Sequence, residues 1–194
     1  PSFLGIPGEN AGRVISANEF LTRVNLMGGD RFPDIDTPVG IGTDVVVIGA
    51  GNTAMDCMRV ARRLGADVRC VYRRSRAEAP ARAEELRHAE EEGVQFLFLH
   101  NPVRYIGDES GRVCQVECIR MELGEPDASG RRRPVPVEGS QFTIDVDTVV
   151  VAIGNGPNPL VPKTTAGLEV DARHGTVKTN METMRTSKRG VFAG

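Results

Sequence analysis

The chain contains 194 residues, of which 40% are hydrophobic and 26% are charged, and its formal net charge is −2 at pH 7. This composition is ordinary for a globular protein, and the small net charge gives no reason to expect a nucleic-acid partner. The sequence has no apolar run of transmembrane length and no signal peptide pattern at its start, so we expect a cytoplasmic protein without a membrane partner.

The four cysteines form no C-x-x-C pair and no zinc-ligand pattern. Cys57 and Cys70 fall in a predicted helix and a predicted strand, and Cys114 and Cys118 share one face of another predicted strand. We expect buried free thiols, as in a reducing compartment, and no metal site. The missing C-x-x-C pair also argues against a thiol-disulfide reductase.

The first 43 residues contain one predicted helix. Glycine and proline recur in residues 1–16, which predicts an extended segment, and apolar residues recur at helical spacing in residues 17–27. Residues 28–43 contain a glycine pair and two prolines, and they are predicted as a loop.

Residues 44–72 have the pattern of a strand, a glycine turn, a helix and a second strand. The apolar run at 45–48 predicts a parallel strand covered on both faces, and residues 49–54 then spell G-x-G-x-x-A. In this motif the first glycine permits a tight turn, the second lets a pyrophosphate approach the backbone, and the small third residue lets the helix pack closely. The pattern favours a dinucleotide site, and the alternative is a simple packing turn between strand and helix.

The end of the second strand distinguishes the two nicotinamide dinucleotides. An NAD site usually places Asp or Glu there, about 20 residues after the glycine turn, but this sequence has Tyr72-Arg73-Arg74-Ser75-Arg76. Arginines fit a 2′-phosphate because the guanidinium group donates paired, charge-assisted hydrogen bonds. We therefore predict NADP(H); the alternatives are a solvated basic loop and an NADH-specific site.

The pattern then changes from alternating helices and strands to consecutive strands. Residues 81–92 are predicted as a helix and residues 94–99 as a third parallel strand. Three further strands are expected to form an antiparallel meander across one face of the sheet, at 101–107, 112–123 and 133–144. A hairpin joint is expected at 125–130, and the neighbouring arginines at 131–133 are expected as a solvated tip.

A second wholly apolar strand at 147–153 is predicted to return to the parallel sheet and to open into the glycine-rich loop 154–159. Ligands of open α/β sheets bind at the carboxyl ends of parallel strands, so this loop is expected to form a second wall of the dinucleotide site. The predicted fold class is α/β, with a Rossmann-like central parallel sheet and an antiparallel meander.

Several segments, taken together and in order, resemble the NADPH-binding part of the glutamate synthase small subunit family. Relatives of that family include the large subunit of NADH-dependent ferredoxin:NADP oxidoreductase and the N-terminal part of dihydropyrimidine dehydrogenase. The matching segments are LGIPGE at 4–9, ANEFL at 17–21, GAGNTAMD at 49–56, VYRRS at 71–75, PAR at 80–82, EEGV at 91–94, MELGEPDASGRRRP at 121–134, AIGNGPNP at 152–159 and TSKRGVFAG at 186–194.

The resemblance implies the NAD(P)-binding domain of a glutathione-reductase-like flavoprotein with two dinucleotide-binding domains. Residues 1–40 would lead in from an FAD domain, residues 41–160 would bind NADP(H), and residues 161–194 would return to the FAD domain. The N-terminal FAD fingerprint is absent, so we expect a fragment of a longer enzyme that is inactive alone.

The resemblance also implies the site residues. The pyrophosphate would lie along the glycine turn, Arg73 and Arg74 would clamp the 2′-phosphate, and the loop at Gly154 would approach the nicotinamide. The expected cofactor-binding set is Gly49, Ala50, Gly51, Asn52, Thr53, Arg73, Arg74, Ala152, Gly154 and Asn155.

The implied parent reaction is hydride transfer between NADPH and FAD, with iron–sulfur centres elsewhere in the parent. No residue of this chain is expected to act as acid, base or nucleophile, and no cysteine set is expected to hold a cluster. The expected partners are the FAD domain of the same chain and a partner subunit or iron–sulfur domain. A non-catalytic interaction module with this fold is the alternative function.

Overall fold

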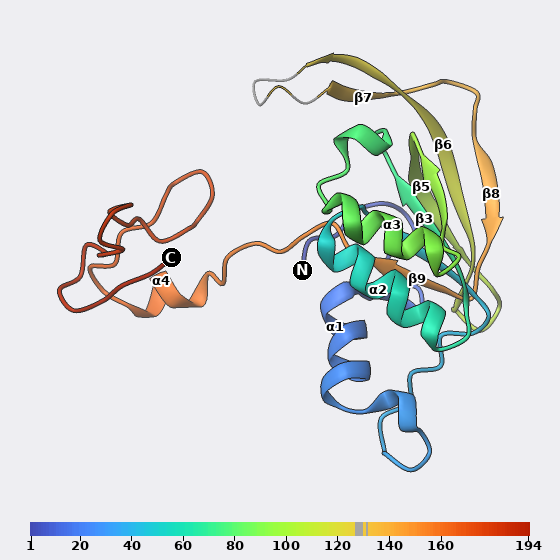
Figure 1. Ribbon diagram of the computed structural model, residues 1–194, viewed down its shortest axis with the longest axis horizontal. Coiled ribbons are helices and arrows are strands. Elements are labelled where there is room, and N and C mark those ends of the chain that lie inside the picture. The colour runs from blue at the N-terminus through green and yellow to red at the C-terminus, as the bar shows by residue number, and fades with distance from the viewer. Residues whose placement is uncertain (127–129, 131) are drawn as a thin grey trace. The chain divides into compact units, whose positions relative to one another are not determined.

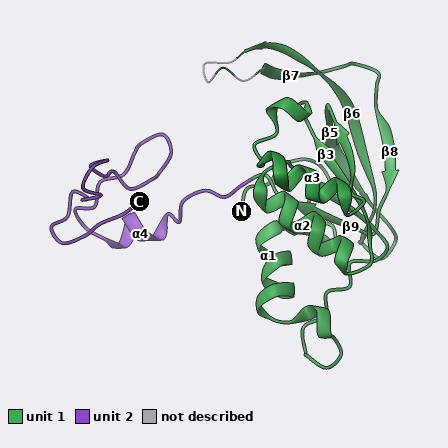
Figure 2. Ribbon diagram, in the orientation of Figure 1, with its two compact units in different colours: residues 1–153 green, residues 154–194 purple. Residues whose placement is uncertain are grey.

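The computed structural model describes residues 1–126, 130 and 132–194 (Figure 1). These residues divide into two compact units, residues 1–153 and residues 154–194 (Figure 2). The expected hairpin joint at 125–130 and the arginine run at 131–133 lie partly outside the described residues. None of the described helices combines the length and apolar character that a membrane span requires.

The first unit is built on a parallel sheet of five strands. Its order is β1–β9–β2–β3–β4, and every neighbouring pair runs parallel. The strands are β1 (Val14–Ser16), β9 (Thr148–Val151), β2 (Asp44–Ile48), β3 (Asp67–Tyr72) and β4 (Gln95–Phe98). β2 therefore lies at the centre of the sheet, where the glycine turn that follows it can open onto the sheet's carboxyl edge.

Helices cover one face of this sheet, and an antiparallel sheet covers the other (Figure 1). The helices of the first face are α1 (Ala17–Leu21), α2 (Asn52–Arg63) and α3 (Ala83–Glu91). The antiparallel strands are β5 (His100–Gly107), β6 (Val113–Pro126), β7 (Arg132–Pro136) and β8 (Phe142–Asp145). β6 is central among them and pairs with β5, β7 and β8.

The valines of β2 explain why the strand reads as a continuous apolar run. Val45 and Val47 belong to the buried cluster beneath the helices, whereas Val46 and Ile48 belong to the cluster beneath the antiparallel strands. Successive side chains of a strand point to opposite faces, so residues 45–48, which are covered on both faces, are all apolar. The predicted parallel sheet and meander are thus confirmed.

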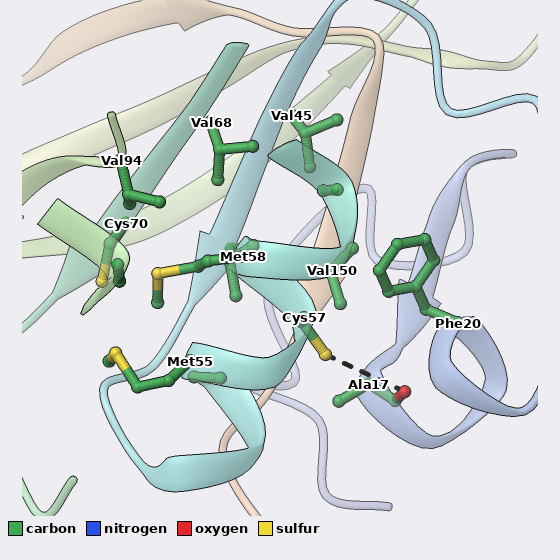
Figure 3. Close-up of a cluster of buried hydrophobic side chains, with 14 of the residues drawn as sticks. Ala17, Phe20, Val45, Met55, Cys57, Met58, Val68, Cys70, Val94 and Val150 are labelled. Atoms are coloured by element: carbon green, nitrogen blue, oxygen red, sulfur yellow. Dashed lines mark hydrogen bonds between the residues drawn. The ribbon is translucent and has the colours of Figure 1, made fainter. Parts of the chain in front are cut away.

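Helix α2 buries one face against the sheet. Its buried residues are Ala54, Met55, Cys57, Met58 and Ala61. Figure 3 shows Met55, Cys57 and Met58 among Val68, Cys70 and Val150 of the sheet. Phe20 of α1 belongs to the same cluster, so α1 is anchored through it.

Three sequence predictions differ from the structure in extent. The segment 1–16, predicted as extended, contributes the edge strand β1, which is short and pairs with β9 alone. The helix predicted at 17–27 is an α-helix only to Leu21 and continues as a π-helix, η1 (Thr22–Leu26). The single strand predicted at 133–144 is divided into β7 and β8, because Gly139 adopts a φ of +74° in a turn that closes between Val137 and Ser140.

The second unit, residues 154–194, contains one short helix, α4 (Leu160–Thr164). Its other regular contacts are isolated antiparallel bridges, Val170 with Val177, Thr179 with Thr186 and Arg185 with Phe192. Most of this unit is therefore irregular in secondary structure.

Candidate functional site

The glycine turn begins directly after β2, and its first glycine is required by the fold. Gly49 has a φ of +120°, and a Cβ atom built there would lie 2.4 Å from the backbone oxygen of Ala152. The N–H of Gly49 donates to the carbonyl of Val71 at 3.0 Å, and the N–H of Ala152 donates to the carbonyl of Ile48 at 2.8 Å. The turn is thus held between the ends of β3 and β9, where no side chain fits.

The second glycine has no such requirement. Gly51 is the N-cap of α2 with a φ of −88°, a value that any residue adopts. A Cβ atom built on Gly51 would meet only Cγ of Pro80, at 3.9 Å, which is an ordinary contact. The described residues give no packing reason for glycine at this position, so the open space beside the backbone of Gly51 is available to a ligand.

The start of α2 lies at this open space. No side chain caps α2, and Asn52 and Thr53 in its first turn are exposed. The N–H groups of a first helical turn have no partner within the helix, and the helix dipole adds partial positive charge there. The turn and the helix start together form an arrangement that suits a pyrophosphate.

Two thiols support the elements behind the turn. The Cys70 thiol of β3 donates to the carbonyl of Gly49 at 3.3 Å, and the Cys57 thiol of α2 contacts the carbonyl of Ala17 at 4.0 Å (Figure 3). Burial raises the pKa of Cys57 and Cys118 to about 12 and raises the pKa of Cys70 as well. These thiols are therefore neutral packing residues; Cys114, expected to be buried too, is half-buried.

The two arginines predicted to clamp the 2′-phosphate lie in different environments. Arg73 is exposed, and its side chain makes no ion pair or hydrogen bond with any residue that the structure describes. Arg74 is only 8% exposed, and its Nε donates to the backbone carbonyl of Arg132 at 3.0 Å. The Arg73 side chain is thus exposed and could reach a phosphate. The Arg74 side chain instead links the end of β3 to β7 through its hydrogen bond.

The loop that follows β3 has a defined conformation. Ser75 and Glu78 form a capping box around the short 3₁₀ helix η3 (Arg76–Glu78), which lowers the pKa of the Glu78 carboxyl. The Tyr72 hydroxyl donates to the carbonyl of Glu78 at 2.9 Å. Arg76 pairs with Glu90 of α3, and this hydrogen-bonded pair lowers the pKa of Glu90. The Arg76 guanidinium is therefore paired with a carboxylate of α3 and is not free to bind a phosphate.

The same loop returns to the glycine turn, which the sequence reasoning missed. The N–H of Ala81 donates to the carbonyl of Ala50 at 3.1 Å, and the N–H of Arg82 donates to Oδ1 of Asn52 at 3.0 Å. Both hydrogen bonds join residues about 30 positions apart, so no local sequence pattern predicts them. The sequence signal for this contact is the PAR segment at 80–82, which is one of the segments that resemble the family.

The residues predicted to form the second wall of the site belong to two different units. Ala152 lies beside Gly49 in the first unit, as its backbone oxygen shows. Gly154, with a φ of +101°, and Asn155 belong to the second unit, so their place beside the turn stays a prediction. Among the residues described, no group of three or more His, Cys, Asp or Glu side chains is arranged to hold a metal ion.

Comparisons with known proteins show the family to which this chain belongs. A profile of the family described as Pyridine nucleotide-disulphide oxidoreductase matches residues 1–194. The NADP(+)-dependent formate dehydrogenase subunit beta of Moorella thermoacetica is 46% identical over 196 residues, which cover 100% of this chain and 26% of that protein. The glutamate synthase (NADPH) small chain of Halomonas elongata is 41% identical over 195 residues, which cover 98% of this chain and 41% of that protein.

A solved structure supports the fold independently. FprA from Mycobacterium tuberculosis, in complex with NADPH, matches 90% of this chain and 51% of its own chain with a TM-score of 0.69 and 23% sequence identity. At this identity the likeness shows the fold alone. The chain spans less than half of the length of each relative in sequence, and about half of the FprA chain.

Proposed function

This chain belongs to the pyridine nucleotide-disulphide oxidoreductase family, and we propose that its residues 41–160 are the NADP(H)-binding domain of a larger flavin-dependent oxidoreductase. In this proposal residues 1–40 and 161–194 connect the domain to an FAD domain. The enzyme resembles the glutamate synthase small chain and its relatives, whose names include NADPH or NADP(+).

The observation that carries the proposal is the contrast between the two glycines of the turn. Gly49 is demanded by its φ and by the Ala152 carbonyl, but nothing in the described fold demands Gly51. A glycine that no steric contact requires, at the start of a helix without a side-chain cap, suits a bound pyrophosphate, because a side chain there would keep the phosphate from the backbone. Ala50, Asn52 and Thr53 complete this turn.

The preference for NADP(H) over NAD(H) rests on Arg73. Residues 73–77, which follow β3 directly, contain no Asp or Glu that could accept a hydrogen bond from a ribose 2′-OH, and the exposed Arg73 offers a charged donor instead. One observation favours the alternative of an NADH-binding version of the same site. Arg74 is buried and bonds the Arg132 carbonyl, so Arg73 is the one exposed arginine of the pair that follows β3.

The chemistry of the enzyme belongs to the cofactors. In the larger enzyme, a bound NADPH would supply a hydride for a flavin, and iron–sulfur centres outside this chain would carry the electrons onward. The residues of this chain bind and orient the dinucleotide: the glycine turn fixes the pyrophosphate, Arg73 fixes the adenosine half, and Ala152, Gly154 and Asn155 border the nicotinamide half. The proposed partners are the FAD domain and an iron–sulfur domain or subunit.

Replacing Gly51 with alanine is expected to separate ligand binding from folding. The new methyl group would stay in ordinary contact distance of Pro80, so the free energy of unfolding should change by less than about 1 kcal/mol. The same methyl group would displace the pyrophosphate, and the affinity for NADPH should fall at least tenfold. Urea unfolding and calorimetric titration check both quantities; unchanged NADPH affinity would contradict the proposed pyrophosphate position.

A further inference from the structure

The contact between Asn52 and Arg82 joins the glycine turn to the arginine-bearing loop. Oδ1 of Asn52, the first residue of α2, accepts the N–H of Arg82, the N-cap of α3, at 3.0 Å. One residue earlier, the N–H of Ala81 donates to the carbonyl of Ala50 at 3.1 Å. We call these two hydrogen bonds the clasp.

The clasp fixes the far end of a loop that is also fixed at its start. The N–H of Leu99 donates to the carbonyl of Arg74 at 3.0 Å, the Tyr72 hydroxyl binds the carbonyl of Glu78, and Arg76 pairs with Glu90. The helix that follows the loop is held as well, because Arg59 of α2 bonds Glu85 at 3.0 Å and Glu92 at 2.7 Å. The backbone of residues 73–82 is therefore pre-organised without a ligand, which lowers the entropic cost of binding one.

Four arginines belong to this loop, and they divide into two classes. Arg74 and Arg76 are committed to Arg132 and Glu90. Arg73 and Arg82 are exposed, and neither guanidinium has a hydrogen bond or ion pair within the part of the chain that the structure describes. The two displayed cations thus stand at the two ends of the loop, one after β3 and one at the glycine turn.

We infer that Arg82 is, together with Arg73, an arginine of the 2′-phosphate site, and that Asn52 is a positioning residue that holds the backbone of Arg82 through the clasp. The backbone N–H groups of the turn and of α2 already serve the pyrophosphate, which leaves the two guanidinium groups for the phosphate on the adenosine ribose. The family resemblance implies that Asn52 lines the pyrophosphate. In this inference its side chain mainly holds the backbone of the loop at Arg82. Both assignments rest on the proposed NADP(H) site.

The test compares equilibrium binding of NADPH and NADH to the intact protein and its variants. Arg82→Ala should raise the Kd for NADPH at least tenfold and the Kd for NADH less than twofold. Arg87→Ala is the matched control, since it removes an exposed α3 arginine that pairs only with Glu91 in the described structure, and it should leave both Kd values unchanged.

Asn52 variants test the clasp separately from the guanidinium. Asn52→Ala should lower the ratio of NADPH to NADH affinity about fivefold, because Arg82 is no longer held. Asn52→Asp keeps an acceptor for the N–H of Arg82. At high salt, where the stronger repulsion of NADPH by the added negative charge is screened, this variant should restore that ratio. A purely structural role of Asn52 would change both affinities together in Asn52→Ala and leave the ratio at its wild-type value.

The outcomes separate the two levels of the assignment. Wild-type binding of NADPH with no selective loss in Arg82→Ala would overturn the role of Arg82 and leave the NADP(H) site standing. An unchanged ratio in Asn52→Ala would overturn the role of the clasp. Absence of binding by the wild-type protein would overturn the proposed function and, with it, both assignments.

Discussion

Gly49→Ala is expected to destabilise the protein by about 2–5 kcal/mol. Two costs combine at this residue. A φ of +120° strains any residue with a Cβ atom by about 1–3 kcal/mol, and the methyl carbon would lie 2.4 Å from the carbonyl oxygen of Ala152. The obstacle is backbone at the end of a central strand, so it cannot turn aside as a flexible side chain would.

Gly65→Ala separates these two costs. Gly65 ends α2 with a φ of +94°, but a Cβ atom built there meets nothing within 4 Å. This variant should therefore show the conformational cost alone, about 1 kcal/mol. Urea unfolding of both variants measures the difference. If Gly49→Ala proves no more destabilising than Gly65→Ala, the turn can move away from β9, and the fixed geometry assigned to it is wrong.

Arg73→Ala is expected to weaken NADPH binding by roughly 10- to 150-fold while NADH binding barely changes. Charge-assisted hydrogen bonds contribute about 1.5–3 kcal/mol each, and NADH has no 2′-phosphate to receive them. The loss should be smaller at high salt, because screening weakens the contribution of an exposed charge. Calorimetric titration with both nucleotides at two salt concentrations measures all of these quantities.

Two companion variants make this result specific. Arg87→Ala removes the same charge from an exposed position on α3 and should behave as wild type. Arg74→Ala should lower the stability of the protein as well as its affinity for NADPH, because it removes a buried side chain that bonds the Arg132 carbonyl. An equal loss of NADPH and NADH affinity in Arg73→Ala would assign Arg73 to the pyrophosphate and remove the basis for NADP selectivity.

The sequence predicted the elements whose signals are local. β2, the glycine turn, α2 and β3 were all anticipated, because their apolar periodicity, glycine positions and helix stop occur within 30 consecutive residues. The family resemblance is confirmed by 41% identity to a glutamate synthase small chain over nearly the whole chain. The resemblance rests on many short segments that occur in the same order, so no single weak motif decides it.

Contacts between distant segments were not predictable in the same way. The edge strand β1 is recognisable only from its pairing with β9, 135 positions later, as Val14 with Val149 illustrates. The burial of Arg74 depends on β7 passing beside the end of β3, and a basic dipeptide gives no sign of which arginine is covered. The clasp at Asn52 likewise depends on a loop returning to the turn.

The predicted site is therefore supported unevenly along the chain. Gly49, Ala50, Gly51, Asn52, Thr53 and Ala152 lie together at the carboxyl edge of the sheet in the first unit. Arg73 is displayed after β3, whereas Arg74 serves the loop. Gly154 and Asn155, and the division into residues 1–40, 41–160 and 161–194, stay predictions.

The most direct test of the account is a calorimetric titration of the wild-type protein with NADPH and NADH side by side, at low and moderate salt. The account predicts tighter binding of NADPH, with a steeper loss of affinity as salt rises, because only NADPH carries the 2′-phosphate that the displayed arginines attract. Equal affinity and equal salt dependence for the two nucleotides would contradict the NADP assignment. No binding of either nucleotide would contradict the dinucleotide site itself.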